Sequence, residues 1–489
     1  MRFLLVALFS FSLLAQPAKP AVEPPPVQKK SSIVIGGKTL NYTTTTGRMP
    51  LMNEAGEPEA HMFYVAYTLD TPTPGNKRPL MVAFNGGPGS ATVWLHLGVL
   101  GPRYIPMQDD GSYPPPPYQV KDNPQTFLPF TDMVFVDPVG TGYSRAAKPE
   151  LGKKFWGVQG DIASVGEFIR LYLGRYNRWS SPLYLIGESY GTFRAAGLSG
   201  WLVDRGMACN GIVLVSSILQ YQTARFSKGN DLPYPLFLPT YTAIAWYHKK
   251  LPASLQQAGL KEATAEAEKF ALNEYSVALM KGDRLTPEER QATLDKLSRL
   301  TGLSKEYLER NNLRPEIMHF IKELRRSEGK VVGRLDGRLT AVEGNNGDEV
   351  AGFDPAMTAI RAPYTAAFND YARRELGYES DLQYYILGGG IGPWDYGAGG
   401  QNKYVETADI LRDAFAKNPY MKVYIGSGYY DLATPYFATE YTFSHMGLPA
   451  EYKKNITTRM YEAGHMFYSV KPALAQLSRD IEAMVTGVR

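Results

Sequence analysis

Short, continuously apolar segments that alternate with helical stretches constrain the fold of this chain more than any other feature of its sequence. Four such segments, each expected to be a strand, are Pro79–Phe84, Asp132–Val136, Leu183–Ile186 and Gly211–Ser216. Helical patterns separate the last three of them, near Gly160–Tyr176 and Gly191–Asp204. Strands without a polar face, joined by helices, are typical of a parallel sheet covered on both faces.

The pattern changes in the middle of the chain. Between residues 220 and 375 no parallel-strand segment stands out, and helical patterns such as Thr286–Thr301 take its place. That segment begins Thr-Pro-Glu-Glu, which suits an N-cap, a proline at the first helical position and an acidic first turn. The strand–helix pattern returns with Met421–Ile425. We therefore expect an α/β core formed by residues 31–219 and 376–489, with a mainly helical cap inserted between them.

The N-terminus predicts export. Arg2 precedes an apolar run, Phe3–Leu14, and Ala15 offers a small residue for cleavage. This is typical of a signal peptide (residues 1–15) and is too short for a membrane span. A buried N-terminal helix is the alternative, but the proline-rich segment that follows cannot continue a helix. We interpret residues 16–30 as a disordered linker.

The composition restricts the cellular compartments and the kinds of partner that we expect for this protein. Cys209 is the one cysteine, so no intramolecular disulfide can form. An exported chain without disulfides suggests a bacterial envelope protein, either periplasmic or secreted. The net charge of +4 over 489 residues gives no reason to expect nucleic acid or a strongly anionic membrane as a partner.

A serine motif lies directly after the third apolar strand. Gly187-Glu188-Ser189-Tyr190-Gly191 matches G-x-S-x-G and opens a helical pattern. A serine in an ordinary tight turn is the alternative, but strand, sharp turn and helix together are typical of the α/β-hydrolase nucleophile. We expect that fold, with a mostly parallel central sheet, helices on both faces and a mainly helical cap. Ser189 is the predicted nucleophile.

A serine nucleophile needs a base and an acid, which in this fold follow it in the order acid, then histidine. Four of the six histidines follow Ser189, and three of those four lie in helical patterns. His465 lies in a glycine-containing loop just before the closing helix, where the base belongs. Asp431 ends a strand and its loop is stopped by Pro435. It is the predicted acid, although a turn or helix-cap carboxylate is an alternative.

The reaction also needs donors for the tetrahedral oxyanion. The backbone N–H of Tyr190 supplies one. The second should come from the glycine-rich segment Asn85–Gly89, since glycines let backbone N–H groups approach the oxygen; an ordinary glycine turn is the alternative. The sequence contains no H-E-x-x-H motif and has too few cysteines for a Cys/His metal cluster. We expect no metal and no cofactor.

Several segments together resemble the serine carboxypeptidase family, and the cap region resembles its bacterial members. In the family's order they are Asn85–Ser90, Leu100–Pro102, Val136–Ser144, Gly187–Gly191, Gly428–Asp431 and Ala463–Met466. The resemblance implies that Gly87 and Tyr190 form the oxyanion hole, and that Asn85 and Glu188 bind the C-terminal carboxylate of a peptide. A carboxyl group can donate to a carboxylate only while protonated, so activity should be better at mildly acidic pH.

One departure from the family leaves the substrate open. Val99 stands where carboxypeptidases of the family commonly carry a second glutamate, and an apolar side chain cannot hydrogen-bond a carboxylate. A serine-type carboxypeptidase acting through an acyl-enzyme is the leading interpretation, with a peptide or ester as substrate. An esterase or acyltransferase with the same triad is one alternative. A catalytically silent envelope binding protein is another.

Overall fold

A computed structural model describes residues 23–70, 77–397 and 403–487. The predicted signal peptide, residues 1–15, lies outside the described residues, as does the first part of the predicted linker. The prediction of a disordered linker is wrong for residues 27–30. They begin β1 (Val27–Ile35), which pairs along its length with β2 (Lys38–Met52), with Val27 opposite Thr46. The polar residues of this segment had hidden an edge strand, whose backbone hydrogen bonds do not need an apolar run.

A ten-stranded mixed sheet organises the described chain. Its order is β1, β2, β3 (Pro58–Leu69), β7 (Asp132–Val136), β4 (Leu80–Phe84), β9 (Leu183–Ser189), β10 (Gly211–Ser217), β13 (Lys422–Gly428) and β14 (Ile456–Tyr461), with β8 (Arg145–Ala146) beside β3. Neighbours from β1 to β7 are antiparallel, and those from β7 to β14 are parallel. The predicted α/β-hydrolase fold with a mostly parallel sheet is confirmed.

Both faces of the sheet are buried, because successive side chains of a strand point to opposite sides. In β4, Met81 and Ala83 join one hydrophobic cluster, whereas Val82 and Phe84 join the other. The first cluster includes side chains of α15 (Lys471–Thr486) and of the buried helical segment formed by α1 (Val93–Leu95) and a π-helix, His96–Leu100. The second contains α2 (Val158–Arg175), α3 (Tyr190–Val203) and α12 (Ala408–Lys417).

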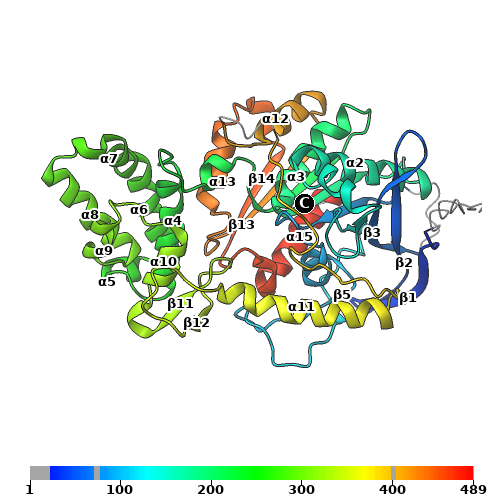
Figure 1. Ribbon diagram of the computed structural model, residues 1–489, viewed down its shortest axis with the longest axis horizontal. Helices are drawn as coiled ribbons and strands as arrows, with labels where there is room; N and C mark the ends of the chain where they lie inside the picture. The colour runs from blue at the N-terminus through cyan, green and yellow to red at the C-terminus, as the bar shows by residue number, and fades with distance from the viewer. Residues whose placement is uncertain (1–22, 71–76, 398–402, 488–489) are drawn as a thin grey trace, which may run out of the picture.

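A third hydrophobic cluster belongs to a separate group of helices. They lie to one side of the sheet, at the left in Figure 1. The elements of this cap are α4 (Pro233–Tyr247), α5 (Ala253–Ala258), α6 (Leu260–Phe270), α7 (Ser276–Lys281), α8 (Pro287–Thr301), α9 (Lys305–Arg310), α10 (Ile317–Glu323), β11 (Lys330–Val332) and β12 (Thr340–Val342). Thr286 and Glu289 form a reciprocal capping box at the start of α8, which agrees with the predicted helix start.

The last helix of the predicted cap packs with the core instead. α11 (Pro355–Arg374) runs along the body of the molecule, at the bottom of Figure 1. The ring of Tyr364 lies 4.9 Å from that of Trp94, and the Tyr371 hydroxyl is 2.7 Å from that of Tyr67. The predicted cap boundary at residue 375 is therefore too late, because α11 has its apolar partners in α1 and β3.

The remaining α-helices and β-strands of the described residues are β5 (Arg103–Tyr104), β6 (Lys121–Asp122), α13 (Tyr436–His445) and α14 (Ala450–Lys453). In the described part of the chain, no helix combines the length and the apolar character that crossing a bilayer requires.

Candidate active site

The predicted nucleophile lies at a sharp turn between β9 and α3. Ser189 is the last residue of β9 and has φ +59°, which is uncommon for a residue with a side chain. The turn leaves no room for flanking side chains: a Cβ at Gly187 would lie 2.1 Å from the Gly191 carbonyl oxygen, and one at Gly191 would lie 2.7 Å from the Phe84 carbonyl oxygen. The motif glycines therefore allow the strained turn that lifts the serine above the carboxyl end of the sheet.

The predicted acid and base are in direct contact. Asp431 Oδ2 lies 2.7 Å from His465 Nδ1, and both side chains are buried. The other carboxylate oxygen accepts N–H groups of Ala433 at 2.7 Å and Thr434 at 3.1 Å, and the Thr434 hydroxyl donates to Oδ2 at 2.7 Å. Asp431 held in this way favours the His465 tautomer with its proton on Nδ1, leaving Nε2 free to accept one.

Burial and the neighbouring charge shift the pKa of the His465 imidazole in opposite directions. Burial lowers the pKa of His465 and the Asp431 carboxylate raises it, with a net rise above the ordinary histidine value. The backbone of the loop is held as well: His465 N–H donates to the Leu335 carbonyl at 2.6 Å, and the Ser216 hydroxyl donates to the His465 carbonyl at 2.6 Å. The base is thus fixed from the sheet and from the cap.

Ser189 and His465 line one pocket of about 150 Å³ together with Gly87, Asn85 and Glu188. The Asn85 side chain is buried, and its Oδ1 accepts the Leu95 N–H at 3.0 Å. By distance and angle its Nδ2 forms no hydrogen bond within the described chain, although the amide lies close enough to Glu188 to lower the pKa of that carboxyl group. A ligand in the pocket can therefore compete for this donor.

A buried ion pair between Arg194 and Asp161 holds the backbone of Asn85. The Arg194 guanidinium donates to the Asn85 carbonyl at 2.6 Å and to Asp161 at 2.8 Å. Arg194 and Asp161 are both buried. Charge-assisted hydrogen bonds of this kind fix the backbone that carries Asn85.

Glu188 is buried beside the candidate base. Burial raises the pKa of this carboxyl group to about 7, against the lowering effects of His465 and of the Tyr468 hydroxyl. The Tyr468 hydroxyl donates to Glu188 Oε2. A carboxyl group with this pKa can be protonated at mildly acidic pH, as donation to a substrate carboxylate requires.

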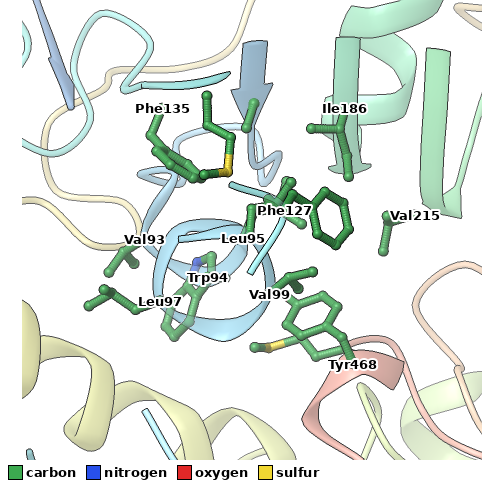
Figure 2. Packing of buried hydrophobic residues seen from close by; sticks show 14 of the residues in the cluster. Val93, Trp94, Leu95, Leu97, Val99, Phe127, Phe135, Ile186, Val215 and Tyr468 are labelled. Atoms are coloured by element: carbon green, nitrogen blue, oxygen red, sulfur yellow. The ribbon is translucent and has the colours of Figure 1, made fainter. Parts of the chain in front are cut away.

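Val99 does not line the pocket. It is fully buried in the π-helix, on the side that faces the ring of Tyr468 (Figure 2). The hydroxyl of that tyrosine, which comes from the loop after His465, is the group that bonds Glu188. The Tyr468 phenol thus bonds Glu188 next to Val99, and the effect of Val99 on binding of a terminal carboxylate stays open.

The two residues predicted to donate to the oxyanion line one pocket together with Ser189. Tyr190 is the first residue of α3, so its N–H has no acceptor within the helix. Gly87 has φ +102° and lines pockets on both sides of Ser189. The arrangement can stabilise negative charge on an oxygen between them.

A second pocket, of about 240 Å³, opens on the other side of Ser189. It shares Gly87, Ala433 and Arg334 with the first pocket. The aromatic rings of its wall come from Tyr190, Tyr221 and Tyr396, and Arg225 stands among them. It contains neither Asn85 nor Glu188.

Sequence reasoning missed three residues of this site. Thr434 follows Asp431 by three positions, a spacing typical of a local turn, and could have been noticed. Tyr468 and Arg334 carry no motif, and their positions come from contacts between distant segments. Among the described residues, no group of three or more His, Cys, Asp or Glu side chains could hold a metal ion.

The chain is similar in sequence to known serine carboxypeptidases. The family model named Serine carboxypeptidase matches residues 37–210. Serine carboxypeptidase-like 36 of Arabidopsis thaliana is 32% identical over 136 residues, which cover 27% of this chain and 26% of that protein. Serine carboxypeptidase-like 50 of the same plant is 27% identical over 270 residues, covering 54% and 53%. The chain thus spans between about a quarter and about half the length of these two curated relatives.

A solved structure extends the likeness to the whole fold. The chain is similar to Kex1(Δ)p, a prohormone-processing carboxypeptidase from Saccharomyces cerevisiae, with a TM-score of 0.54 and 14% identity over 91% of each chain. That match shows the α/β-hydrolase fold. The bacterial character of the chain stays a prediction, since these relatives come from a plant and a yeast. The chain thus resembles the serine carboxypeptidase family in sequence over residues 37–210, and it has the α/β-hydrolase fold.

Proposed function

We propose that this protein is a serine carboxypeptidase that removes the C-terminal residue of a peptide. The observation that carries the proposal is the pocket shared by Ser189, His465, Asn85 and Glu188. A buried carboxyl group and an amide donor line the same pocket as the nucleophile, and both suit a terminal carboxylate. We further propose that the enzyme acts outside the cytoplasm, in the periplasm or secreted.

The proposed reaction proceeds in two halves. His465 Nε2 accepts the Ser189 proton as Oγ attacks the scissile carbonyl carbon, and the N–H groups of Gly87 and Tyr190 bind the resulting oxyanion. The intermediate collapses, the C–N bond breaks, and His465 returns the proton to the leaving amine. A water molecule then attacks the acyl–Ser189 ester with His465 again as base, which releases the shortened peptide and restores the serine.

Substrates that differ only at the C-terminus test the carboxylate site. An N-blocked dipeptide with a free carboxylate, its amide and its methyl ester should be compared by kcat/KM. We expect the free acid to be hydrolysed faster than the amide, because only the acid can use Asn85 and Glu188. Preference for the ester, with no cleavage of the free acid, would instead support the esterase or acyltransferase alternative.

A fluorophosphonate probe tests whether the serine is reactive at all. We expect covalent labelling of Ser189 in the native protein and none in Ser189→Ala, with labelling slowed in His465→Ala because the base is missing. Intact mass and peptide mapping give the site. Absence of labelling in folded protein would favour the catalytically silent binding protein.

A further inference from the structure

Two pockets meet at Ser189, and a peptide cleaved there would extend into both of them. If Asn85 and Glu188 hold the terminal carboxylate, the leaving residue occupies the first pocket. The scissile carbonyl carbon must lie at Ser189, and the rest of the substrate must continue beyond it. The second pocket, which also contains Ser189 and Tyr190, is the described space available to that acyl part.

The second pocket carries positive charge. Arg225 and Arg334 line it, and none of its lining residues in the described chain is acidic. Arg225 is held in place: its guanidinium lies 4.9 Å from the centre of the Tyr221 ring and donates to the Tyr396 hydroxyl at 3.2 Å. Stacking of this kind leaves other guanidinium N–H groups free for a ligand.

Arg334 is the more unusual of the two cations. Its backbone is fixed, because its N–H donates to Asp354 at 3.0 Å and its carbonyl accepts the Leu432 N–H at 3.0 Å. Its guanidinium forms no hydrogen bond or ion pair with the described residues, although the residue is half-buried. A partly desolvated guanidinium with five donors and no acceptor favours binding a carboxylate.

The charge of Arg334 also reaches the candidate base. It lowers the pKa of His465, which places the guanidinium within electrostatic range of the imidazole. Arg334 lines both pockets, as Ser189 does. An anion bound to Arg334 would therefore lie next to the reacting bond.

We propose that Arg334 and Arg225 form a binding site for an acidic side chain on the acyl side of the scissile bond, so that the enzyme prefers peptides whose penultimate residue is Glu or Asp. The preference rests on the proposed carboxypeptidase function and names its substrate class. The two guanidinium groups bind the side-chain carboxylate, and the rings of Tyr221 and Tyr396 cover its methylene groups.

Three N-blocked dipeptides test the preference with the native enzyme. They share one C-terminal residue and differ only in a penultimate Glu, Gln or Lys. Glu and Gln have nearly the same shape, so their ratio reports charge. We expect kcat/KM for Glu to exceed that for Gln by about tenfold, since hydrogen bonds to charged groups are stronger than neutral ones. Lys should be the poorest, and added salt should reduce the differences.

Variants assign the effect to the two arginines. Arg334→Gln and Arg225→Gln should each lower the Glu-to-Gln ratio, and the double variant should bring it close to 1. Arg310→Gln, an exposed residue of α9 in the cap, is the matched control and should keep the native ratio. Thermal unfolding of each variant checks that the fold is retained.

The outcomes separate this proposal from the function on which it rests. If none of the dipeptides is cleaved, the carboxypeptidase function fails. If Glu and Gln peptides are cleaved equally well by the native enzyme, the acidic preference is wrong and the carboxypeptidase function stands. If Arg334→Gln weakens all three peptides by the same factor, Arg334 acts on the terminal carboxylate or on His465 instead, and the acyl-side assignment is overturned.

Discussion

The Glu188 carboxyl group lies buried next to the candidate base, and its pKa is raised to about 7. It can donate to a substrate carboxylate below that pH and repels the carboxylate above it. We therefore expect kcat/KM for a free-acid dipeptide to fall as pH rises through about 7, from a rise in KM. In the pH profile of kcat/KM, the fall at low pH (the acidic limb) is assigned to His465, which must be neutral to accept a proton. Because the pKa of His465 is raised, this acidic limb lies above the ordinary histidine range, and the fall at high pH is the alkaline limb.

Glu188→Gln checks the assignment of the alkaline limb. The amide donates at every pH, so the fall above about 7 should disappear while the acidic limb remains. The methyl ester substrate should lack the alkaline fall even with the native enzyme. An unchanged alkaline limb in Glu188→Gln would show that another group controls it.

The Tyr468 hydroxyl also acts on the pKa of the Glu188 carboxyl group. Its hydrogen bond to Glu188 favours the ionised carboxylate, so it lowers the Glu188 pKa against the effect of burial. In Tyr468→Phe that pKa should rise, and the alkaline limb for free-acid substrates should move to higher pH. Tyr420→Phe, at a residue that is 88% exposed, is the control. A shift of the limb to lower pH would contradict this role.

The candidate site was predictable where chemistry restricts the choice. Chain order and the exclusion of helical histidines selected His465, and its 2.7 Å contact with Asp431 agrees with that pairing. The roles of both residues stay predictions. Tyr468 and Arg334 could not be found in this way, because Tyr468 meets a carboxyl group 280 positions away and Arg334 comes from the cap.

At the scale of the elements, the turn between β9 and α3 depends on its glycines. In Gly187→Ala the new methyl group would lie 2.1 Å from the Gly191 carbonyl oxygen, so the turn must open. We expect a loss of stability of about 3 kcal/mol, typical of severe overpacking, together with loss of fluorophosphonate labelling. Urea unfolding and labelling rates give the two values.

Gly344→Ala is the matched control for that substitution, because a Cβ there meets no atom within 4 Å. It should change neither stability nor labelling by a measurable amount. Full labelling of Gly187→Ala with native stability would contradict the proposed role of the turn.

The predicted strands were most accurate where they are buried on both faces. The range predicted for β7, Asp132–Val136, is that of the structure. β14, Ile456–Tyr461, was missed because it is an edge strand with exposed polar residues and no continuous apolar run. The place of α11 could not be read from its sequence either, since its partners Trp94 and Tyr67 lie far away in the chain.

At the scale of the whole molecule, the cap contacts the candidate base through the loop between β11 and β12. The Asp336 carboxylate accepts the Gly464 N–H at 3.2 Å and binds Arg338 at 2.6 Å. The preceding residue, Leu335, accepts the His465 N–H. A change in this loop should therefore act on the reaction from outside the pocket.

Asp336→Ala should lower kcat by about tenfold with a smaller change in KM, because losing the bonds to Gly464 and Arg338 loosens the loop that carries the base. Asp348→Ala, an exposed residue of the same region, should have native kinetics. Steady-state kinetics on one dipeptide measure both. Equal kcat values for the two variants would mean that the cap does not position the base.

The most direct test of the proposed enzyme is the release of the C-terminal residue from an N-blocked dipeptide, measured by mass spectrometry between about pH 5 and about pH 8. The native protein should release that residue at a rate that rises with pH as His465 loses its proton and falls again through about pH 7 as Glu188 ionises. Ser189→Ala should show only a small residual rate. No release by folded, fluorophosphonate-reactive protein at any pH in this range, or release by Ser189→Ala at the native rate, would contradict the account.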